Sequence, residues 1–382
     1  MKKIMKATLA KGIAAASLFA VLPVSLLAQS ELYPGHFDLE EVRLLDSPFL
    51  EAMKLNDSAL FEYDADRLLT AAVVQAGLND DPDSKYYRWK ESHPVYPIWY
   101  YESSVPHYVS SLALACAASS DETMKMRLKE RLEYMLGILK DCQDVTDGNT
   151  EGLCGYVGTE PLADMWKELY KGNTAPFIQN GGWCPFYYVH KMLAGLRDAW
   201  MYADNEAARG MYRKLADWSV NVISNLSDGQ LQSILGVEHG GMVELLADAY
   251  SIFGDEKYLD AARRYGHDWL LDGMQSLNAT LLDGQHANST VPKFMGFERI
   301  YQVQQRSGSE VEPEYHVAAC NFWEDVVGNR TVCIGGNSVS EHFIPAAKGS
   351  QYIDNLEGPE SCNSYNMLKL SEILSDETHD AR

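Results

Sequence analysis

Apolar residues recur at intervals of three and four along most of the chain, which is the spacing of one face of a helix. A stripe of leucine and methionine predicts a helix over residues 121–142. Residues 47–62 predict another, because the Ser-Pro pair at its start suits an N-cap followed by the first helical position. A third helix is expected over residues 185–202. Strand-like alternation is confined to residues 331–334, so the pattern predicts an all-α protein.

Three stretches of the chain share a weak repeat with a period of about fifty residues. In each, a short acidic turn precedes a helix with a tryptophan that we expect to be buried, and the turns begin near Ala203, Phe253 and Glu312. Repeated helix pairs form either an open solenoid or a closed α/α toroid. Glycine, histidine and aromatic residues are concentrated in the loops between the units, which favours a toroid whose loops surround a cup.

Residues 1–28 resemble a secretory signal peptide. Four lysines precede or enter an apolar run that ends near Leu27, and Ala28 follows it. The run is shorter than the roughly 20 residues of a membrane span, so we expect cleavage and no membrane-spanning segment afterwards. The protein would then be exported, to the periplasm or the extracellular space, with residues 29–382 as one partial α/α-barrel domain.

Composition narrows the class of partner. The chain is 46% hydrophobic and 23% charged, which excludes a disordered protein and allows a large core. Its net charge of −22 repels phosphate backbones, so we expect no nucleic-acid partner and favour neutral glycans. The seven cysteines include no C-x-x-C pair, which argues against a zinc ribbon, and most of them are expected to be small core residues.

Five loops place ionisable residues beside glycines or at helix ends, where a backbone can approach a ligand closely. Taken singly, each histidine is more simply a helix cap or a core residue. In a closed ring, the five loops would converge on one rim. They comprise residues 183–191, 238–242, 283–288, 335–343 and 359–366. The first also holds Trp183, Phe186, Tyr187 and Tyr188, which either stack on a sugar or pack at a helix start.

Glu360 and Cys362 are candidate metal ligands. On a regular helix, residues two apart point in different directions, but at a helix entrance they can converge on one ion. A thiolate and a carboxylate suit Zn²⁺, although a structural zinc site requires four ligands. The pair alone therefore predicts half a site.

Segments in three of these loops resemble glycoside hydrolase family 127 and its sister family 146, the bacterial β-L-arabinofuranosidase-like proteins. The resemblance rests on Glu238–Met242 (Glu-His-Gly-Gly-Met), on Gly335–Phe343 and on Glu360–Leu370, and it extends from about Phe37 to Leu370. Members of the family have an (α/α)6 barrel followed by β-sandwich modules. The resemblance therefore implies a helical toroid here.

The same resemblance implies a reaction: retaining hydrolysis of terminal L-arabinofuranosides of plant-type glycans by a zinc-bound cysteine nucleophile, instead of the usual two carboxylates. Glu341 matches the general acid/base, and Glu360 and Cys362 match two of the zinc ligands. The positions that match histidines hydrogen-bonded to the sugar are His190, His239 and His286.

The chain departs from the family pattern after Leu370. The family's nucleophile and a further zinc ligand lie in a Cys-Cys segment, but no Cys-Cys pair occurs here and the sequence ends at Arg382. Residues 89–107 also lack the family's glycine-rich run. We therefore expect a barrel that is incomplete at its C-terminal end and lacks the β-sandwich modules, with an incomplete zinc site and no nucleophile.

Two other functions fit the residues. A non-catalytic carbohydrate-binding fragment would keep the histidines without cleaving a bond, and no hydrolysis of an aryl β-L-arabinofuranoside would then be seen. A two-carboxylate α/α-toroid glycosidase would pair Glu341 with an acid such as Asp248. It would need no zinc, so its activity would survive chelation.

Overall fold

The computed structural model describes residues 32–94, 104–147, 151–159, 162–180, 184–236, 238, 240–278 and 280–379. The expected signal peptide and His239 lie outside these residues. All regular elements within them are helical, and the remaining pairing consists of two isolated β-bridges. None of the described helices is long and apolar enough to cross a membrane.

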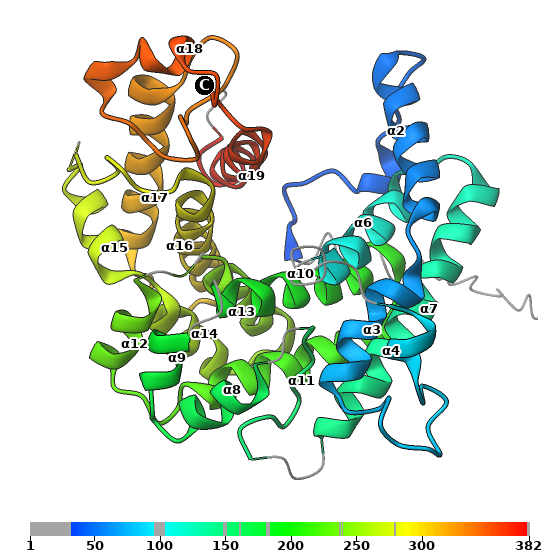
Figure 1. Cartoon of the computed structure of the whole chain (residues 1–382). Helices are drawn as coiled ribbons and strands as arrows, with labels where there is room; N and C mark the ends of the chain where they lie inside the picture. Colours follow the sequence, from blue (N-terminus) through cyan, green and yellow to red (C-terminus); the bar gives the residue numbers. More distant parts are fainter. Residues whose placement is uncertain are drawn as a thin grey trace, which may run out of the picture.

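The helices form two layers around a ring (Figure 1). Each inner helix packs against the next one in chain order, and outer helices link the inner ones. The inner helices are α6 (Ser104–Ala118), α10 (Pro185–Ala203), α13 (Met242–Phe253), α16 (Ala287–Ser307) and α19 (Ser361–Thr378). The outer helices are α7 (Glu122–Thr146), α11 (Glu206–Val222), α14 (Glu256–Tyr265) and α17 (Pro313–Asp325). This arrangement confirms the predicted all-α toroid.

Shorter elements decorate the ring. On the N-terminal side lie η1 (Leu39–Glu41), α2 (Pro48–Ala59), η2 (Leu60–Glu62), α3 (Ala65–Gln75) and α4 (Trp89–Ser92). The connections between ring helices contain α8 (Ala163–Tyr170), α9 (Ala175–Asn180), α12 (Asp228–Leu235) and α15 (Asp268–Gln275). The segment before α19 holds η3 (Val326–Arg330), η4 (Ala346–Lys348) and α18 (Gln351–Asp354).

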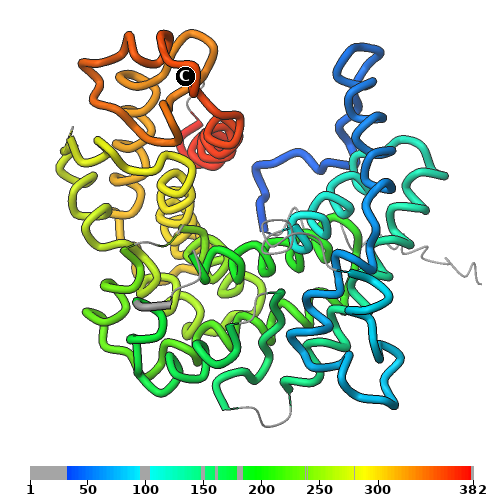
Figure 2. The backbone as a smooth tube through the Cα atoms, in the orientation of Figure 1, coloured from blue at the N-terminus to red at the C-terminus, as the bar shows by residue number. Residues whose placement is uncertain are grey.

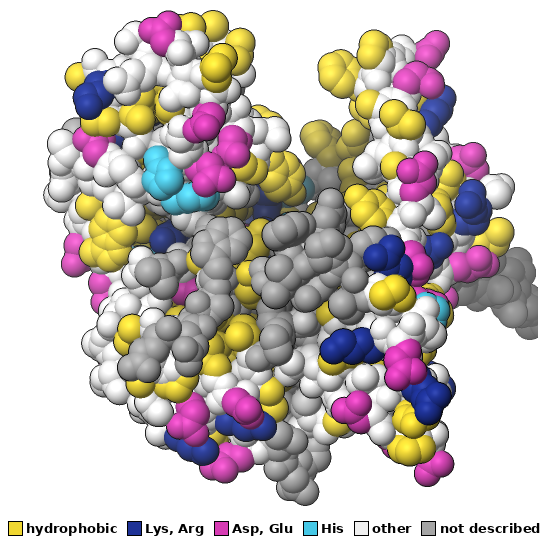
Figure 3. All heavy atoms as spheres, viewed as in Figure 1, with side chains coloured by type: hydrophobic (Ala, Val, Ile, Leu, Met, Phe, Trp, Pro, Cys, Tyr) yellow, Lys and Arg dark blue, Asp and Glu magenta, His cyan; other side chains and the backbone are white. Residues whose placement is uncertain are grey.

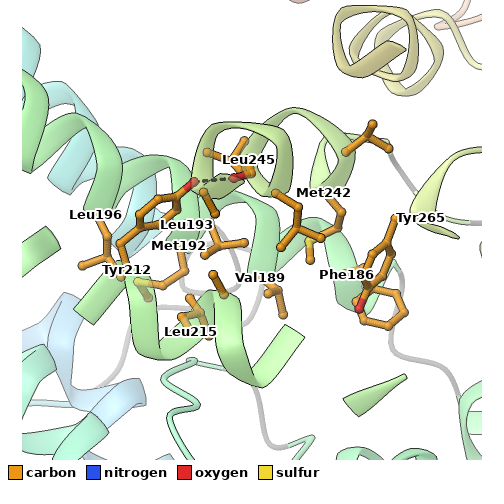
Figure 4. Packing of buried hydrophobic residues seen from close by; sticks show 14 of the residues in the cluster. Phe186, Val189, Met192, Leu193, Leu196, Tyr212, Leu215, Met242, Leu245 and Tyr265 are labelled. Atoms are coloured by element: carbon orange, nitrogen blue, oxygen red, sulfur yellow. Dashed lines mark hydrogen bonds between the residues drawn. The ribbon is translucent and has the colours of Figure 1, made fainter. Parts of the chain in front are cut away.

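Burial distinguishes the two layers. Every residue of α13 from Met242 to Tyr250 is buried, because an inner helix is covered on all sides. The outer helix α14 instead buries one stripe and exposes the other face. The core between the layers joins α10, α11, α13 and α14, and the Tyr212 hydroxyl donates a hydrogen bond to the Leu245 carbonyl within it (Figure 4).

The three predicted helices are confirmed as α2 with η2, α7 and α10. The acidic turns of the repeat are helix starts: Asn205 and Asp255 cap α11 and α14 with their side chains, and Glu312 is the N-cap residue of α17 without a side-chain capping hydrogen bond. The repeat predicts a buried tryptophan correctly in one of its three units. Trp218 of α11 is buried and Trp323 of α17 is half-buried. Trp269 is 41% exposed, because α14 ends before Gly266 and Trp269 is the second residue of the separate helix α15.

Two smaller expectations were wrong. Residues 331–334 form a turn closed by the Gly335 amide on the Val332 carbonyl, not an extended strand. Most cysteines were expected in the core, yet only three of the seven are buried and none forms a disulfide. The buried ones are Cys116, Cys142 and Cys184.

The ring is open on one side in the described part of the chain. Helix α19 faces α2 and α6 across the opening (Figures 1 and 2). The space-filling view is hollowed between these two sides (Figure 3). The described inner layer has five helices, one fewer than an (α/α)6 barrel requires.

The N-terminal segment reaches into the ring before α2 begins. The Tyr33 side chain is buried, and its hydroxyl donates to Asp248 Oδ2 at 2.8 Å. The Leu32 carbonyl accepts from Arg299 and Arg306 of α16 at 2.9 and 2.8 Å. This segment therefore contacts α13 and α16 directly, although it is more than two hundred residues away in sequence.

Candidate active site

A cavity of about 150 Å³ lies inside the ring. Inner helices line it: His190 and Lys191 from α10, Glu244 from α13, and Tyr365 and Asn366 from α19. The inner helices turn these side chains toward the centre because their other faces pack against the outer layer. Of the five loops predicted to surround a cup, residues 183–191 and 359–366 supply side chains to this cavity.

His190 is held at this cavity by the loop before α13. A Cβ at Gly241 would lie 2.2 Å from His190 Cε1, so only glycine permits this approach. Burial, with Lys191 beside it, lowers the pKa of His190 well below its usual value, which leaves the imidazole neutral. Burial also lowers the pKa of Lys191 to about 8. A neutral imidazole can both donate and accept, as a sugar hydroxyl requires.

Glu244 is a charged group in the cavity that the sequence reasoning did not single out. Burial opposes its ionisation, but Lys369 and Arg197 outweigh that effect and hold its pKa below the usual value. Lys369 Nζ lies 3.6 Å from Glu244 Oε1, and Arg197 lies 3.0 Å from the same atom. A signal did exist, because Glu244 interrupts an otherwise mostly apolar helix.

Two of the aromatic residues at the start of α10, Phe186 and Tyr188, do not form the stacking platform that was one of the two interpretations. Phe186 and Tyr188 are buried in the core. Tyr187 is half-buried, and its hydroxyl lies 3.5 Å from His107 Nε2. Trp183 lies outside the described residues. For Phe186 and Tyr188, packing at a helix start is therefore the correct interpretation.

His286 caps α16 and at the same time faces Glu341. Its Nδ1 accepts from the Ser289 amide at 3.3 Å, which places the proton of the neutral ring on Nε2. Nε2 lies 3.5 Å from Glu341 Oε2. The Ala287 amide also donates to the Glu341 carbonyl at 2.8 Å, so the start of α16 fixes both the backbone and the side chain of Glu341.

Glu341 lies at the tip of a two-residue hairpin turn. Val339 and His342 exchange both backbone hydrogen bonds, at 2.9 and 3.0 Å. The two central residues, Ser340 and Glu341, have φ of 46° and 68°, the left-handed region that type I′ turns require and that usually takes Asn-Gly. Each non-glycine residue there costs about 1–2 kcal/mol. Such strain is typical of functional sites.

The start of α19 is fixed to the same loop as the hairpin. Asn363 donates to Ser338 Oγ at 2.5 Å, and Ser364 Oγ donates to the Gly335 carbonyl at 3.3 Å. A Cβ at Gly336 would lie 2.0 Å from Pro359 Cβ, so glycine is required where the two segments cross. Glu341 and the Glu360–Cys362 pair therefore lie in segments that are hydrogen-bonded to each other.

Glu360 and Cys362 converge. Glu360 is the N-cap of α19, and Cys362 Sγ donates to Glu360 Oε2 at 3.7 Å. Burial and the Glu360 carboxylate raise the pKa of the Cys362 thiol. No group of three or more potential metal ligands occurs among the residues that the structure describes. These two donors therefore do not complete a zinc site, and no chemical step is derived through a metal.

A hydrogen bond links the Glu341 region to the cavity. Asn366 of α19 donates to Asn288 Oδ1 at 2.6 Å, and Asn288 is the second residue of α16 after His286. Asn366 itself lines the cavity together with His190. Figure 3 shows histidine and acidic side chains next to one another on the left-hand side of the opening.

Asp248, the alternative second carboxylate, is not available. Its side chain is fully buried, and its two oxygens accept from Arg299 Nε and Arg197 Nη1, each at 2.6 Å. The Tyr33 hydroxyl occupies the same oxygen as Arg197. A carboxylate with these partners stabilises the ring and cannot reach a glycosidic bond, which disfavours the two-carboxylate mechanism with this residue.

Comparison with known proteins agrees with the fold. The model of the β-L-arabinofuranosidase GH127 catalytic domain matches residues 41–382. The structure is similar to a solved GH127 β-arabinofuranosidase with a TM-score of 0.58 and 17% identity, over 90% of this chain and 51% of that one.

A GH127 β-L-arabinofuranosidase from Geobacillus stearothermophilus T6 is similar with a TM-score of 0.54 and 14% identity, over 83% of this chain and 48% of that one. The chain thus spans about half the length of these two proteins. A search of the curated proteins found no match. The match of the domain model over most of the sequence shows that the chain belongs to glycoside hydrolase family GH127.

Proposed function

We propose that the chain acts on terminal L-arabinofuranosides of plant-type glycans, with Glu341 as general acid/base of a retaining hydrolysis. The observation that carries this proposal is the position of Glu341: an exposed carboxylate on a strained turn, fixed by the start of α16 and next to His286 Nε2. A carboxyl group so placed can protonate the leaving glycosidic oxygen and then accept a proton from water.

Substrate binding is proposed for the cavity inside the ring. The neutral His190 imidazole and the Asn366 amide can donate to and accept from sugar hydroxyls, and His286 can donate through Nε2. The chain's acidity favours neutral glycans over anionic ones. His239 belongs to the same proposal by its place in the sequence.

The test is hydrolysis of an aryl β-L-arabinofuranoside by the purified chain and by Glu341→Gln. We expect the substitution to lower kcat/KM by about 10²–10⁴-fold, the usual contribution of general acid/base catalysis. Glu310→Gln, which neutralises an exposed carboxylate on the loop before α17, is the matched control and should keep full activity. Equal activity of wild type and Glu341→Gln would refute the role of Glu341.

Glu360 and Cys362 are proposed to supply two ligands of a Zn²⁺ site. Their convergence supports this, but the further donors are not among the described residues. Metal analysis after dialysis against dilute zinc should show that Glu360→Gln and Cys362→Ser bind less zinc than the wild type. Identical metal contents would exclude these ligands.

A second function is non-catalytic binding of carbohydrate. The observation that favours it is the metal pair of Glu360 and Cys362, which within the described part of the chain is not completed to a site that could activate a thiolate. Calorimetric titration with L-arabinose, together with the hydrolysis assay, separates the two functions. Binding without any turnover of the aryl glycoside supports the binding function, whereas turnover that Glu341→Gln abolishes supports the hydrolase.

Export is proposed from the sequence of residues 1–28. Expression of the full chain followed by mass measurement of the secreted product tests it. A mature N-terminus near Gln29 is expected, and retention of the full-length chain in the cytoplasm would contradict it.

A further inference from the structure

A second group of reactive side chains lies outside the cavity, between α16, α17 and α19. Cys320 Sγ of α17 is 3.5 Å from His316 Nε2, one turn earlier on the same helix. On the other side of the imidazole, His316 Nδ1 is 2.9 Å from Glu298 Oε2 of α16. Thiol, imidazole and carboxylate are thus arranged in the order used to activate a nucleophile.

The packing holds this arrangement in place. Glu298 is fully buried, and the Tyr301 ring stacks on the His316 ring with a centroid distance of 4.7 Å. Because the carboxylate accepts at Nδ1, the Nε2 atom is the one presented to the sulfur. The imidazole therefore has one fixed orientation, set by two residues of α16.

The charges around His316 favour its protonated form. Hydrogen bonds of His316 with Cys320 and Glu298 raise the pKa of His316 to about 10. Burial raises the pKa of Glu298. The contact with His316 opposes this rise, and the negative charge of Glu377 of α19 adds to it. A cysteine beside a protonated imidazole is the environment in which a thiol becomes a nucleophile.

Cys320 also faces a space that a small molecule can enter. It lines a cavity of about 200 Å³ between α17 and α19, together with Trp323, Leu374, Ser371 and Thr378. Two of these side chains are apolar and two carry hydroxyls, while the exposed carboxylate of Glu324 lies at the same cavity. This lining suits a small uncharged molecule and disfavours an anionic one.

We propose that Cys320 is a selectively reactive thiol that exchanges with small uncharged organic disulfides entering the cavity between α17 and α19. The proton of the Cys320 thiol passes to Nε2 of the neutral His316 ring, which forms the protonated imidazole that Glu298 stabilises, and the thiolate attacks one sulfur of the disulfide. A new bond forms between Sγ and that sulfur as the original S–S bond breaks. The departing thiolate takes the proton from His316, leaving a mixed disulfide on Cys320 and one free thiol.

The site is separate in its residues from the proposed glycosidase site. None of Cys320, His316 and Glu298 lines the cavity inside the ring, and none contacts Glu341 or Glu360 among the interactions of the described residues. Modification of Cys320 and hydrolysis of a glycoside can therefore be measured independently on the same protein.

The experiment treats the native chain with 2-hydroxyethyl disulfide at several pH values and follows each cysteine by peptide mass spectrometry. Cys154 and Cys333 are exposed and serve as controls within the same molecule. At pH 7 we expect Cys320 to react at least about tenfold faster than either control. Between pH 6 and 8 its rate should change less than about threefold, whereas ordinary thiols accelerate almost tenfold per pH unit.

Variants identify the cause of the reactivity. His316→Asn should slow Cys320 to the rate of the controls and give it their steep pH dependence, while Glu298→Gln should give an intermediate rate. Circular dichroism checks that each variant is folded. In denaturant, all three cysteines of the wild type should react alike. A native Cys320 that reacts no faster than Cys154 and Cys333, or with the same pH dependence, would overturn the proposal without the use of any variant.

Discussion

Two acidic regions of the ring differ in every respect that matters for chemistry. Asp248 lies in the interior with an arginine at each oxygen and a tyrosine hydroxyl beside them. Glu341 lies on the rim with a side chain 59% exposed, one imidazole 3.5 Å away and a backbone in the left-handed region. The Asp248 carboxylate has an arginine at each oxygen, whereas the exposed Glu341 carboxylate has room for a ligand.

This difference separates structural from chemical carboxylates. A buried carboxylate with strong partners loses them if it reacts, so it is suited to holding helices together. A carboxylate held through its backbone, with its oxygens facing solvent, keeps its position while a proton moves. The cost of the strained turn at Glu341 is consistent with a residue placed for activity and not for stability.

The largest expected effect concerns the buried cluster around Asp248. Asp248→Asn leaves Arg299 buried without its carboxylate partner and removes one of the three carboxylates around Arg197, so it should lower the free energy of unfolding by about 3–5 kcal/mol. Tyr33→Phe removes only a hydroxyl from the same cluster and should cost about 1 kcal/mol. Urea denaturation followed by circular dichroism measures both. Equal losses in the two variants would show that the ion pairs do not stabilise the ring.

Glu238 provides an intermediate case, a buried carboxylate that no arginine contacts among the described residues. Burial raises its pKa to about 8, with the amides of Phe186 and Tyr187 opposing the rise. Its contribution to stability is therefore complete below the unfolded pKa of about 4.5 and is lost as the pH rises through 8.

Glu238→Gln should remove that dependence. Relative to wild type, the variant should gain about 3–5 kcal/mol of stability between pH 4.5 and 9. Urea denaturation at a series of pH values gives the difference directly. A difference that stays constant over this range would show that Glu238 is ionised in the folded protein at neutral pH.

The smallest expected effect concerns the strained turn at Glu341 on the rim. Glycine adopts the left-handed conformation of residue 341 without steric strain. Glu341→Gly should therefore raise the free energy of unfolding by about 1 kcal/mol relative to Glu341→Gln. Both variants lack the carboxylate, so both should be inactive in the hydrolysis assay. If glycine is no more stable than glutamine at this position, the turn carries no strain.

Helices and caps could be predicted from the sequence because their signals are local. Ser47, Asp121 and Pro185 mark the starts of α2, α7 and α10 as expected. The repeat wrongly predicted that Trp269 is buried. The chain leaves the helix at Gly266 and His267, and this break exposes Trp269. Periodicity alone does not detect a break inside a unit.

The candidate site was predictable in part. The loops that hold Glu341, Glu360 and Cys362 were identified, and in the structure these segments are hydrogen-bonded to each other. The strained turn that holds Glu341 could not be predicted, because Ser340-Glu341 is not the Asn-Gly pair that is typical of a type I′ turn. The cluster of Cys320, His316 and Glu298 was missed because Glu298 comes from another helix, and only packing places it at His316.

The contact between Tyr33 and the ring has a consequence for how the protein reaches its final form. The first described residues bind side chains of α13 and α16, and His36 reaches Asp376 of α19 at 2.7 Å. These contacts span most of the chain, so a ribosome must release nearly all of it before they can form. The beginning of the molecule is accordingly among the last parts to acquire its native surroundings.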